Sequence, residues 1–448
     1  MMLLDILYAT VFVIALPWVL FMLLTRPAFR AGLRARFRPG LDPDPARKTI
    51  WLHGSSAGEI DLLRALVEPE EALPGDYRVV VSAFSISGYT VAKKAFPEHT
   101  VIYFPADFSF IVRRFLKAID PSLIVLVESE LWPNFIATVH DAGIPVCVVN
   151  ARMSEKSYRK HQRIRLIPRA LAKLDMIAAQ TGEDADRFID LGVDPDRLHV
   201  TGNMKYDRCN AGDARENEAL RRRLREQYGI ASDMPVLIGG SVHRGEDRVI
   251  VSVYKRLIDA GHALRLILVP RYPAEAPAVM GELQNLGLEG VRKSALRKHP
   301  ETVFDKPSRV LLVDTMGELG QFYAMSDIAY VGGSLHYRGS NKGGHNLMEP
   351  AVLGIAVLFG PHNYSFRETV RDLLAAGGGA LVQDEAELAA TLERLLADPE
   401  ARAEMGRRAR RVILDNRGAA RQNLQLLREY LPPGSVRPDS TTNQGIPT

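Results

Sequence analysis

Short apolar runs alternate with amphipathic stretches over most of the chain from Lys48 onward. In the first half, runs of strand length occur at Thr49–His53, Arg78–Phe84, Val101–Pro105, Leu123–Glu128, Pro145–Asn150 and Met176–Gln180. In the second half they occur at Val236–Gly239, Leu264–Val269, Val310–Val313, Ile328–Val331 and Ala356–Phe359. The stretches between them have helical periodicity, as at Ile60–Leu66, Phe108–Ala118 and Trp132–His140. This alternation predicts βαβ units and parallel sheets.

A polar, charged segment, Asp207–Glu226, separates the two series of strands. Since 448 residues are too many for one ordinary core, we expect an α/β protein with two Rossmann-like domains, 48–210 and 211–431. Ligands of such sheets bind at the carboxyl ends of the strands, so we expect the site in a cleft between the domains. The segment 432–448 is rich in Pro, Ser, Thr and Asn and is predicted to be a disordered tail.

The N-terminal segment Ile6–Leu24 is almost entirely apolar, with no charge between Asp5 and Arg26. About 20 such residues suffice to cross the hydrocarbon core of a bilayer. Arginines follow the segment and no basic residue precedes it, so the positive-inside rule places the rest of the chain in the cytoplasm. We therefore expect residues 1–26 to be a single-pass anchor in the inner membrane and residues 27–47 a basic linker. The alternative is a hydrophobic helix that lies on the membrane or in a core.

Composition narrows the class of protein and the kinds of partner and site to be expected. With 46% hydrophobic and 25% charged residues the chain is typical of a globular protein. Its net charge of +4 is too small to indicate a nucleic-acid partner, and none is expected. The two cysteines, Cys147 and Cys209, give neither a disulfide framework nor a zinc cluster.

A glycine-rich stretch from Val331 to Pro361 follows one of the buried strands. Its pattern predicts a strand ending at Val331, a glycine loop, a short helix from about Asn346 to Gly354, and a further strand. Free backbone N–H groups and a helix N-terminus at that place would suit a phosphate. Equally, the glycines could serve only turns, with Asn346 and Glu349 forming a capping box.

Glu59 lies on the first turn of a predicted helix, directly after the first strand. A carboxylate at that edge of the sheet could act as a general base. The spacing Ser56-x-x-Glu59 is also that of a capping box, in which Glu59 folds back on the Ser56 amide. The spacing alone favours the cap.

Other strands also end in polar residues. Glu128 and Glu130 follow a buried strand, where unpaired acids are costly, and alternation points both to one side. Lys205 ends a strand-like run near the domain boundary, and Arg271 follows another strand in a position suited to a phosphate. Polar residues also follow strands at Ser241–Glu246 and Asp314–Glu318. Together these strand exits, the polar segments that directly follow a strand, favour a nucleotide site.

The stretch from Ser154 to Arg169 is strongly basic and interleaved with apolar residues. Such a surface can meet anionic lipid head groups. The ordinary alternative is a solvated face.

The motifs WLHGSSAGE, VESELWPN, NARMSEKS, TGNMKYD, LVPR, DTMGEL and VGGSL…GGHNLME…GPH occur in this order over nearly the whole chain. Together they resemble bacterial 3-deoxy-D-manno-octulosonate (Kdo) transferases. The resemblance implies a GT-B glycosyltransferase with acceptor contacts in the N-terminal half and CMP contacts in the C-terminal half. It also implies transfer of Kdo from CMP-Kdo to the lipid A precursor at the cytoplasmic membrane surface, in lipopolysaccharide biosynthesis.

The resemblance assigns roles position by position. Glu59 corresponds to the catalytic base, and Glu128 and Lys205 to residues that stabilise the transition state. The CMP-binding positions are Pro270, Arg271, Met316, Gly317, Glu318, Asn346, Leu347, Met348 and Glu349. No cofactor or metal is implied.

The chain departs from the family pattern in two places. Residues Tyr337–Lys342 lengthen the turn before GGHN, and Leu347-Met348 replaces the usual Pro-Leu. Two alternatives remain open: another membrane-associated GT-B enzyme that uses a different nucleotide sugar on an envelope lipid, and a non-catalytic scaffold that kept the fold.

Overall fold

The computed structural model describes residues 2–42, 44, 47–67, 77–164, 166–209, 212, 214–296, 300–339 and 343–431. The expected tail, 432–448, lies outside these residues. Two compact units make up the chain. The first comprises Met1–Arg208 with Arg417–Thr448, and the second comprises Cys209–Asn416.

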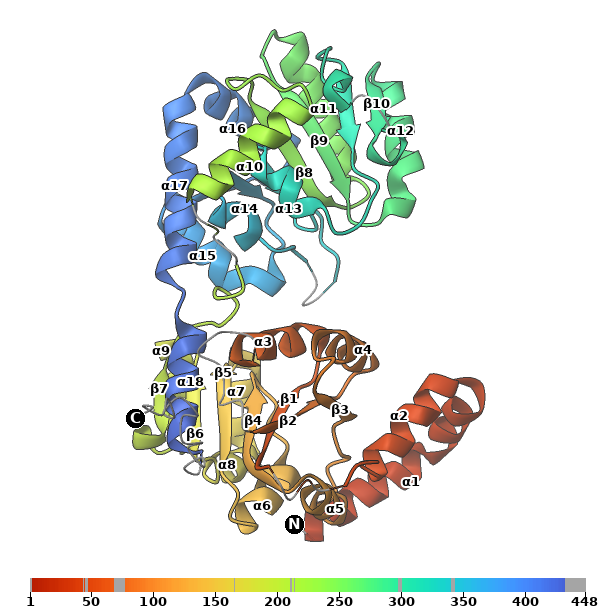
Figure 1. Ribbon diagram of the computed structural model, residues 1–448, viewed down its shortest axis with the longest axis vertical. Helices are drawn as coiled ribbons and strands as arrows, with labels where there is room; N and C mark the ends of the chain where they lie inside the picture. The colour runs from red at the N-terminus through yellow and green to blue at the C-terminus, as the bar shows by residue number, and fades with distance from the viewer. Residues whose placement is uncertain are drawn as a thin grey trace, which may run out of the picture. The chain divides into compact units, whose positions relative to one another are not determined.

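The first unit is built on a parallel sheet that has seven strands within the described residues (Figure 1). In spatial order they are β3 (Thr100–Tyr103), β2 (Arg78–Ala83), β1 (Thr49–Gly54), β4 (Pro121–Val127), β5 (Val146–Ala151), β6 (Met176–Ala179) and β7 (Leu198–Val200). Side chains alternate between two cores, because Trp51 packs into one and Ile50 and Leu52 into the other. The sequence prediction of a parallel α/β sheet is confirmed.

Helices cover both faces of this sheet. They are α3 (Ala57–Val67), α4 (Ile86–Ala95), α5 (Ser109–Ile119), α6 (Pro133–Asp141), α7 (Glu155–Arg163), α8 (Leu166–Leu171), α9 (Gly182–Asp190) and α18 (Ala419–Glu429). Residues of α3, α4 and α18 fill one core, and residues of α5, α6, α8 and α9 fill the other.

The C-terminal helix α18 corrects the expected domain limits. We expected the second domain to run through 431, but Leu424 and Leu427 are buried against α3 and the first sheet. Asp207 holds the start of the helix by accepting hydrogen bonds from the backbone nitrogens of Gly418 (2.6 Å) and Ala420 (2.8 Å). Figure 1 shows α18, in blue, among the elements of the first unit.

Two helices precede the first sheet. Helix α1 (Met2–Thr25) contains the apolar segment, and the 22 residues Leu4–Thr25 are long and apolar enough to cross a membrane, with a mean hydropathy of 2.4. Helix α2 (Pro27–Phe37) occupies most of the expected basic linker. The segment is helical over these residues, with proline at its first turn, and its role as a linker stays a prediction.

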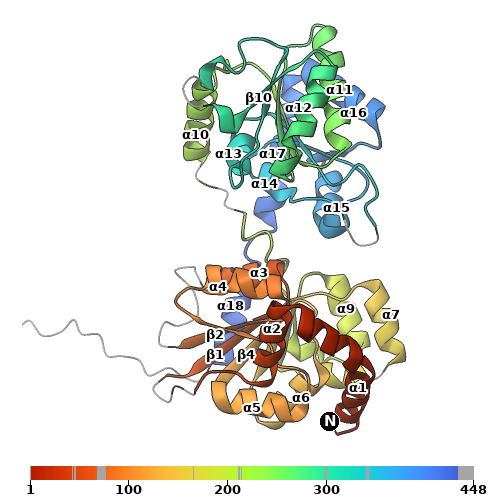
Figure 2. The same ribbon diagram turned by 90° about the vertical axis from the view of Figure 1, so that its right-hand side faces the viewer.

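The second unit has its own parallel sheet, again with seven strands among the described residues. In spatial order they are β10 (Glu289–Arg292), β11 (Arg309–Leu312), β9 (Arg265–Pro270), β8 (Val236–Val242), β12 (Ile328–Val331), β13 (Ala356–Phe359) and β14 (Gly379–Leu381). Its helices are α10 (Ala214–Gln227), α11 (Glu246–Asp259), α12 (Ala276–Asn285), α13 (Leu319–Ala324), α14 (Met348–Val352), α15 (Arg367–Ala375), α16 (Glu385–Ala397) and α17 (Pro399–Asp415). Figure 2 shows these helices from a second direction.

Candidate active site

Glu59 forms the capping box that its spacing allows. Its carboxylate accepts hydrogen bonds from the backbone nitrogens of Ser55 (2.6 Å) and Ser56 (3.4 Å) and from the Ser56 hydroxyl (3.0 Å). In return, the Glu59 nitrogen donates to the Ser56 hydroxyl (3.3 Å). These bonds close the turn between β1 and α3 and hold the carboxylate at the carboxyl edge of the sheet. The side chain is only partly buried, so solvent still reaches it.

Burial raises the pKa of Glu59, and the negative charges of Glu130 and Glu128 raise it further. The hydrogen bonds from Ser55 and Ser56 act in the opposite direction but do not cancel these effects. Three carboxylates from two strand exits are therefore electrostatic neighbours. A carboxylate with a raised pKa is better matched to taking a proton near neutral pH than an ordinary one.

Glu130 has the opposite balance. Burial alone would raise its pKa, but hydrogen bonds from His53, Trp132 and Ser55 outweigh it and lower the pKa. Its carboxylate lies 2.7 Å from the Trp132 indole nitrogen and 3.4 Å from His53 Nε2. Glu130 therefore stays ionised beside Glu59. Neighbouring carboxyl groups whose pKa values are pushed apart are typical of acid–base sites.

Glu128 is buried and lies between two cations. Its Oε2 is 2.9 Å from Arg152 Nε, and its Oε1 is 3.3 Å from Lys205 Nζ. The residue has a φ of 58°, a strained value for a non-glycine residue. Expected candidates Glu128 and Lys205 are thus brought together, although they are far apart in the sequence.

Buried amide side chains position the loop that carries Lys205. Asn203 accepts a hydrogen bond from the Lys205 nitrogen (3.0 Å) and donates to Gln180 Oε1 (3.1 Å). Gln180 in turn donates to the Asn150 carbonyl (2.9 Å), and the Asn150 side chain accepts from the Met204 nitrogen (2.9 Å). These bonds link the ends of β5, β6 and β7, so the backbone at Lys205 is fixed by the sheet itself.

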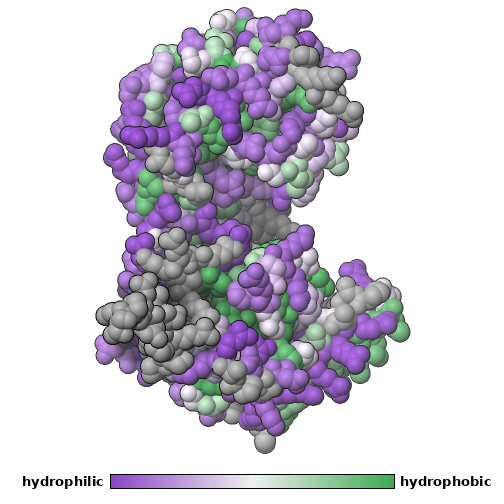
Figure 3. Space-filling view, viewed as in Figure 1, coloured by the Kyte–Doolittle hydropathy of each residue, from purple (hydrophilic) through white to green (hydrophobic). Residues whose placement is uncertain are grey.

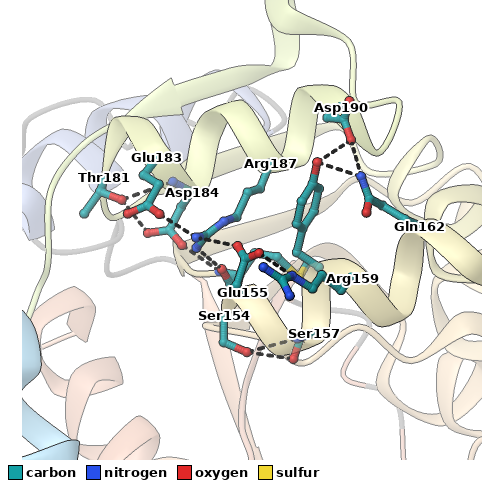
Figure 4. Close-up of polar contacts among 12 residues, drawn as sticks. Ser154, Glu155, Ser157, Arg159, Gln162, Thr181, Glu183, Asp184, Arg187 and Asp190 are labelled. Atoms are coloured by element: carbon teal, nitrogen blue, oxygen red, sulfur yellow. Dashed lines mark hydrogen bonds and ion pairs between the residues drawn. The ribbon is translucent and has the colours of Figure 1, made fainter.

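A second network holds the loop that carries Arg152 (Figure 4). The Asp184 carboxylate accepts a hydrogen bond from the Met153 nitrogen (2.7 Å), and Arg187 donates to the Met153 carbonyl (2.7 Å). Figure 4 shows the Arg187 guanidinium between Glu155 and Glu183, which form ion pairs with it. Helix α9 thus fixes the loop that leads from Arg152 into α7.

The same network occupies part of the basic stretch. Arg159 forms an ion pair with Glu155 one turn earlier on α7, while Tyr158 and Gln162 bind Asp190 of α9. Lys156, Lys160 and Arg163 are exposed. Contact with lipid head groups through this stretch stays a prediction.

In the second unit, the glycine loop is held by a buried carboxylate. Glu246, at the start of α11, accepts hydrogen bonds from the backbone nitrogens of Gly333 (2.7 Å), Ser334 (2.8 Å) and Leu335 (2.9 Å). The expectation of free N–H groups in this part of the loop was therefore wrong, because a carboxylate already satisfies them. Gly333 has a φ of 74°, and a side chain on it would approach His345 to 2.9 Å.

Cations and histidines gather beside this loop. The Nε2 atoms of His243 and His345 lie 2.8 Å apart, and their rings stack with centroids at 5.0 Å. Burial, together with His243 and the charges of Arg271 and Arg338, lowers the pKa of His345 to about 4. Arg271 and Arg338 therefore lie close to the histidine pair, and side chains rather than loop amides supply the positive potential here.

The expected CMP-binding residues occupy three exits of the second sheet. Pro270 ends β9, and the Arg271 nitrogen donates to the Val242 carbonyl of β8 (2.8 Å). Met316 is exposed, and Gly317 has a φ of 83° in the turn before α13. Glu318 forms an ion pair with Lys293 (2.6 Å), which lowers the pKa of Glu318.

The third exit leads into α14, which is shorter than expected. Asn346 accepts a hydrogen bond from the Met348 nitrogen (3.1 Å) and donates to the Glu349 carboxylate (3.0 Å). The N-cap of α14 is Leu347, so these contacts hold the turn without forming the capping box. Leu347 and Met348 are buried, and any contact of theirs with a ligand would be made by the backbone. The helix has five residues, too few for a strong N-terminal field.

Sequence reasoning missed several residues of these sites. Arg152, Asn150 and Gln180 were read only as parts of strands or motifs, and Arg338 only as part of the lengthened turn. Asn150 and Gln180 share one signal, a polar residue at the end of an apolar run, which identified charged candidates such as Glu128 and Arg271 but was not extended to amides. Of the lengthened turn, Ser340–Lys342 lie outside the described residues.

No group of three His, Cys, Asp or Glu side chains is arranged as a metal site in the part of the chain that the structure describes. The expectation of no cofactor or metal stays a prediction.

Comparisons with known proteins agree with the motifs. A family model described as 3-deoxy-D-manno-octulosonic-acid transferase (kdotransferase) matches residues 31–208. A 3-deoxy-D-manno-octulosonic acid transferase of Haemophilus influenzae is 32% identical over 411 residues, covering 90% of this chain and 92% of that protein. The protein of that name from Bordetella pertussis is 32% identical over 415 residues, covering 90% of each.

Solved structures show the same fold at low identity. A glycosyltransferase from Rickettsia africae has a TM-score of 0.54 at 13% identity, covering 86% of this chain and 99% of its own. A UDP-GlcNAc 2-epimerase from Neisseria meningitidis has a TM-score of 0.55 at 14% identity, covering 85% and 100%. At this identity the likeness concerns the fold alone.

Proposed function

The chain belongs to the family of 3-deoxy-D-manno-octulosonic acid (Kdo) transferases, and we propose that it transfers Kdo from CMP-Kdo to the lipid A precursor. Membership makes it a glycosyltransferase of lipopolysaccharide biosynthesis, with the GT-B fold of two Rossmann-like units and an N-terminal apolar helix. The acceptor, the roles of individual residues and the direct displacement belong to the proposal.

The observation that carries the mechanism is the raised pKa of Glu59 beside the ionised Glu130. An acceptor hydroxyl is a weak nucleophile until a base removes its proton. In the proposed step the proton passes to Glu59, the hydroxyl oxygen forms a bond to the anomeric carbon of Kdo, and the bond from that carbon to the phosphate oxygen breaks. CMP then leaves. Cap and base are compatible roles, because the Ser55 and Ser56 bonds fix the carboxylate that must take the proton.

Glu128 and Lys205 are proposed to stabilise the transition state. Lys205 supplies a positive charge, and its ion pair with Glu128 (3.3 Å) fixes where that charge lies. Preorganised charges of this kind cost no reorganisation when the reaction occurs. Arg152 forms a second ion pair with Glu128 on its other side. The carboxylate is therefore shared between two cations, and the charge of Lys205 is only partly offset by it.

The donor is proposed to bind the second unit through its phosphate. Arg271 and Arg338 provide the positive potential, and the histidines beside them have lowered pKa values and stay neutral. The expected contacts at 316–318 follow β11, which neighbours β9, and those at 346–349 follow the glycine loop after β12. Both are proposed to complete the CMP site. A cleft between the two domains stays a prediction.

The enzyme is proposed to work at the cytoplasmic face of the inner membrane. Support comes from the apolar helix α1, which is mostly exposed, and from the arginines that follow it. The single span expected from the sequence is one form of this attachment.

Purified protein incubated with CMP-Kdo and a lipid A precursor tests the proposal. We expect a product heavier than the acceptor by one or more Kdo residues in the mass spectrum, and protection from thermal unfolding by CMP but not by UDP. Protection by UDP alone would favour the enzyme that uses another nucleotide sugar. Absence of any transfer would favour the scaffold.

A further inference from the structure

The first helix is attached to the first unit at its beginning. The Asp5 carboxylate accepts hydrogen bonds from the Ser109 nitrogen (2.9 Å), the Ser109 hydroxyl (2.5 Å) and the Asn134 side chain (2.8 Å). Helix α5 has no side-chain cap of its own at Phe108. Asp5 therefore supplies the carboxylate that an N-cap would provide, although it comes from a helix more than 100 residues earlier.

A second contact lies one turn along α1. The Tyr8 hydroxyl donates to Asp107 Oδ2 (3.1 Å), and the Tyr8 ring packs edge-on against Phe108, with centroids at 5.9 Å. Asp107 in turn caps α6, because its carboxylate accepts from the nitrogens of Asn134 (3.3 Å) and Phe135 (2.7 Å). The start of α1 is thus joined to the starts of two helices of the first unit.

The remainder of α1 has a single stripe of less exposed residues, of which only Val19 is buried among the described residues. The less exposed residues follow spacings of three and four: Asp5, Tyr8, Phe12, Ala15, Val19 and Met22. Large apolar side chains cover the rest of the helix and are exposed: Ile6, Leu7, Val11, Val13, Ile14, Leu16, Trp18, Leu20, Phe21 and Leu24. Beyond Asp5 and Tyr8, α1 packs mainly against α2, so the two helices together carry the exposed apolar side chains.

Helix α2 returns toward the same unit. The two helices lie side by side as a hairpin in Figures 1 and 2. Near the end of α2, the Arg36 guanidinium donates to the carbonyls of Phe84 and Phe104 and stacks over the Phe84 ring at 4.2 Å. Both ends of the hairpin, at Asp5 and Arg36, therefore contact the rest of the first unit.

A transmembrane span is incompatible with this attachment. At 1.5 Å per residue, the about 20 residues from Asp5 to Thr25 cover roughly 30 Å, the thickness of the hydrocarbon core. If α1 crossed the bilayer, Asp5 and Tyr8 would lie on the face opposite to Ser109 and Asp107. We propose that α1 and α2 instead form a hairpin that inserts into the cytoplasmic leaflet, with Asp5 and Arg36 both on the cytoplasmic side. The inference rests on the proposed location at the inner membrane.

The surface of the hairpin fits a leaflet of anionic lipid. Arg30, Arg34 and Arg38 are exposed at four-residue spacing on α2 and beyond it, and with Leu33 and Phe37 they line an open groove beside α1. Apolar side chains can enter the acyl region while the arginines remain among the phosphates. Figure 3 shows apolar and polar side chains next to each other on the limb formed by this hairpin.

Labelling of one added cysteine separates the two topologies. The cysteine is placed in a short Gly-Ser extension before Met1 of the full chain and treated with a membrane-impermeant maleimide, in spheroplasts and in inside-out vesicles. The native thiols Cys147 and Cys209 are buried, and the unextended chain gives their background. Arg38→Cys, cytoplasmic in both topologies, controls for sidedness.

We expect at least ten-fold more labelling of the extension in inside-out vesicles than in spheroplasts, as for Arg38→Cys. Labelling mainly in spheroplasts, or equally from both sides, would overturn the hairpin. Kdo transfer is measured in the same vesicles, so the two proposals fail separately: spheroplast labelling with intact transfer removes only the hairpin, and absent transfer in the unextended chain removes the proposed function.

Discussion

The carboxylate of Glu246 lies 2.7 Å from the backbone nitrogen of Gly333, although 87 positions separate the two residues. The same carboxylate accepts hydrogen bonds from the nitrogens of His243, Ser334 and Leu335. One buried side chain thus fixes the β8 exit and the glycine loop together. The geometry of the proposed donor site depends on it, because His243 and His345 are carried by these two segments.

Glu246→Gln is expected to destabilise the second unit. The amide keeps one acceptor oxygen but replaces the other with a donor, which leaves backbone N–H groups unsatisfied at about 1–3 kcal/mol. Urea unfolding followed by circular dichroism measures the loss. Glu282→Gln, at a partly exposed residue with a weak 3.9 Å ion pair, is the control. Equal stability of the two variants would contradict the role of Glu246.

The histidine pair predicts a loss of stability in acid. A histidine whose pKa falls to about 4 on folding, from about 6.5 in the unfolded chain, binds fewer protons when folded. Its contribution to stability is therefore present above about pH 6.5 and is lost as the pH falls toward 4. Unfolding midpoints measured across this range should decline more steeply in the wild type than in His345→Asn. Parallel declines would contradict the assignment.

Asp107 predicts the opposite slope over nearly the same pH range. Burial raises the pKa of Asp107 to about 7, even though hydrogen bonds from the amides of Phe135 and Asn134 act in the opposite direction. The folded state then binds more protons than the unfolded state, so this contribution to stability is lost as the pH rises from about 4 to about 7. Asp107→Asn loses one of the two oxygens that accept backbone hydrogen bonds, so it should be less stable than the wild type at pH 4, but its free energy of unfolding should fall less between pH 4 and pH 7. The exposed Asp186→Asn should follow the wild-type decline, and an equally steep decline in Asp107→Asn would contradict the prediction.

Arg271 is expected to carry much of the affinity for CMP. Hydrogen bonds to charged groups contribute about 1.5–3 kcal/mol, so Arg271→Gln should weaken CMP binding roughly 10–100-fold. Isothermal titration calorimetry measures the dissociation constant. Arg248→Gln, at an exposed arginine of α11, should leave it unchanged. An unaltered dissociation constant in Arg271→Gln would show that the phosphate binds at another place.

Most of the fold was predictable because buried parallel strands are continuous apolar runs. The strands that sequence reasoning missed, β10 and β14, are the edges of the second sheet, and β7, recognised only as a strand-like run, is an edge of the first. They are short and less buried, and β10 (Glu289–Arg292) even begins and ends with charge. Their strand geometry comes from pairing with a neighbour, which no local pattern records. Helix α18 was assigned to the wrong unit for a similar reason, since its partners are distant in the sequence.

The site was predictable where a residue type reveals its role and less so where contacts decide. Glu59, Glu128, Lys205 and Arg271 were all expected at strand exits, and the structure places them there. That Glu246 would occupy the loop amides was not foreseen, because the glycine pattern is the same whether a phosphate or a carboxylate satisfies them. The apolar run of α1 likewise fits a span, and only the contacts that Asp5, Tyr8 and Arg36 make with the first unit indicate otherwise.

Glu59 is the residue on which the proposed chemistry depends, and its capping role must be separated from catalysis. Glu387 offers a matched control, since its carboxylate accepts from the Gln383 nitrogen (2.8 Å) and its own nitrogen donates to Asp384 (2.9 Å) at the start of α16. Either substitution by glutamine is expected to cost about 1 kcal/mol of stability at most, the usual worth of a cap.

The most direct test measures initial rates of Kdo transfer from CMP-Kdo to the lipid A precursor by Glu59→Gln and Glu387→Gln, both confirmed as folded. We expect Glu59→Gln to be slower than the wild type by roughly 10²–10⁴-fold, the usual range for loss of a general base, and Glu387→Gln to be within two-fold of the wild type (about the scatter of such assays). Near-normal transfer by folded Glu59→Gln would contradict the account and leave Glu59 as a helix cap alone.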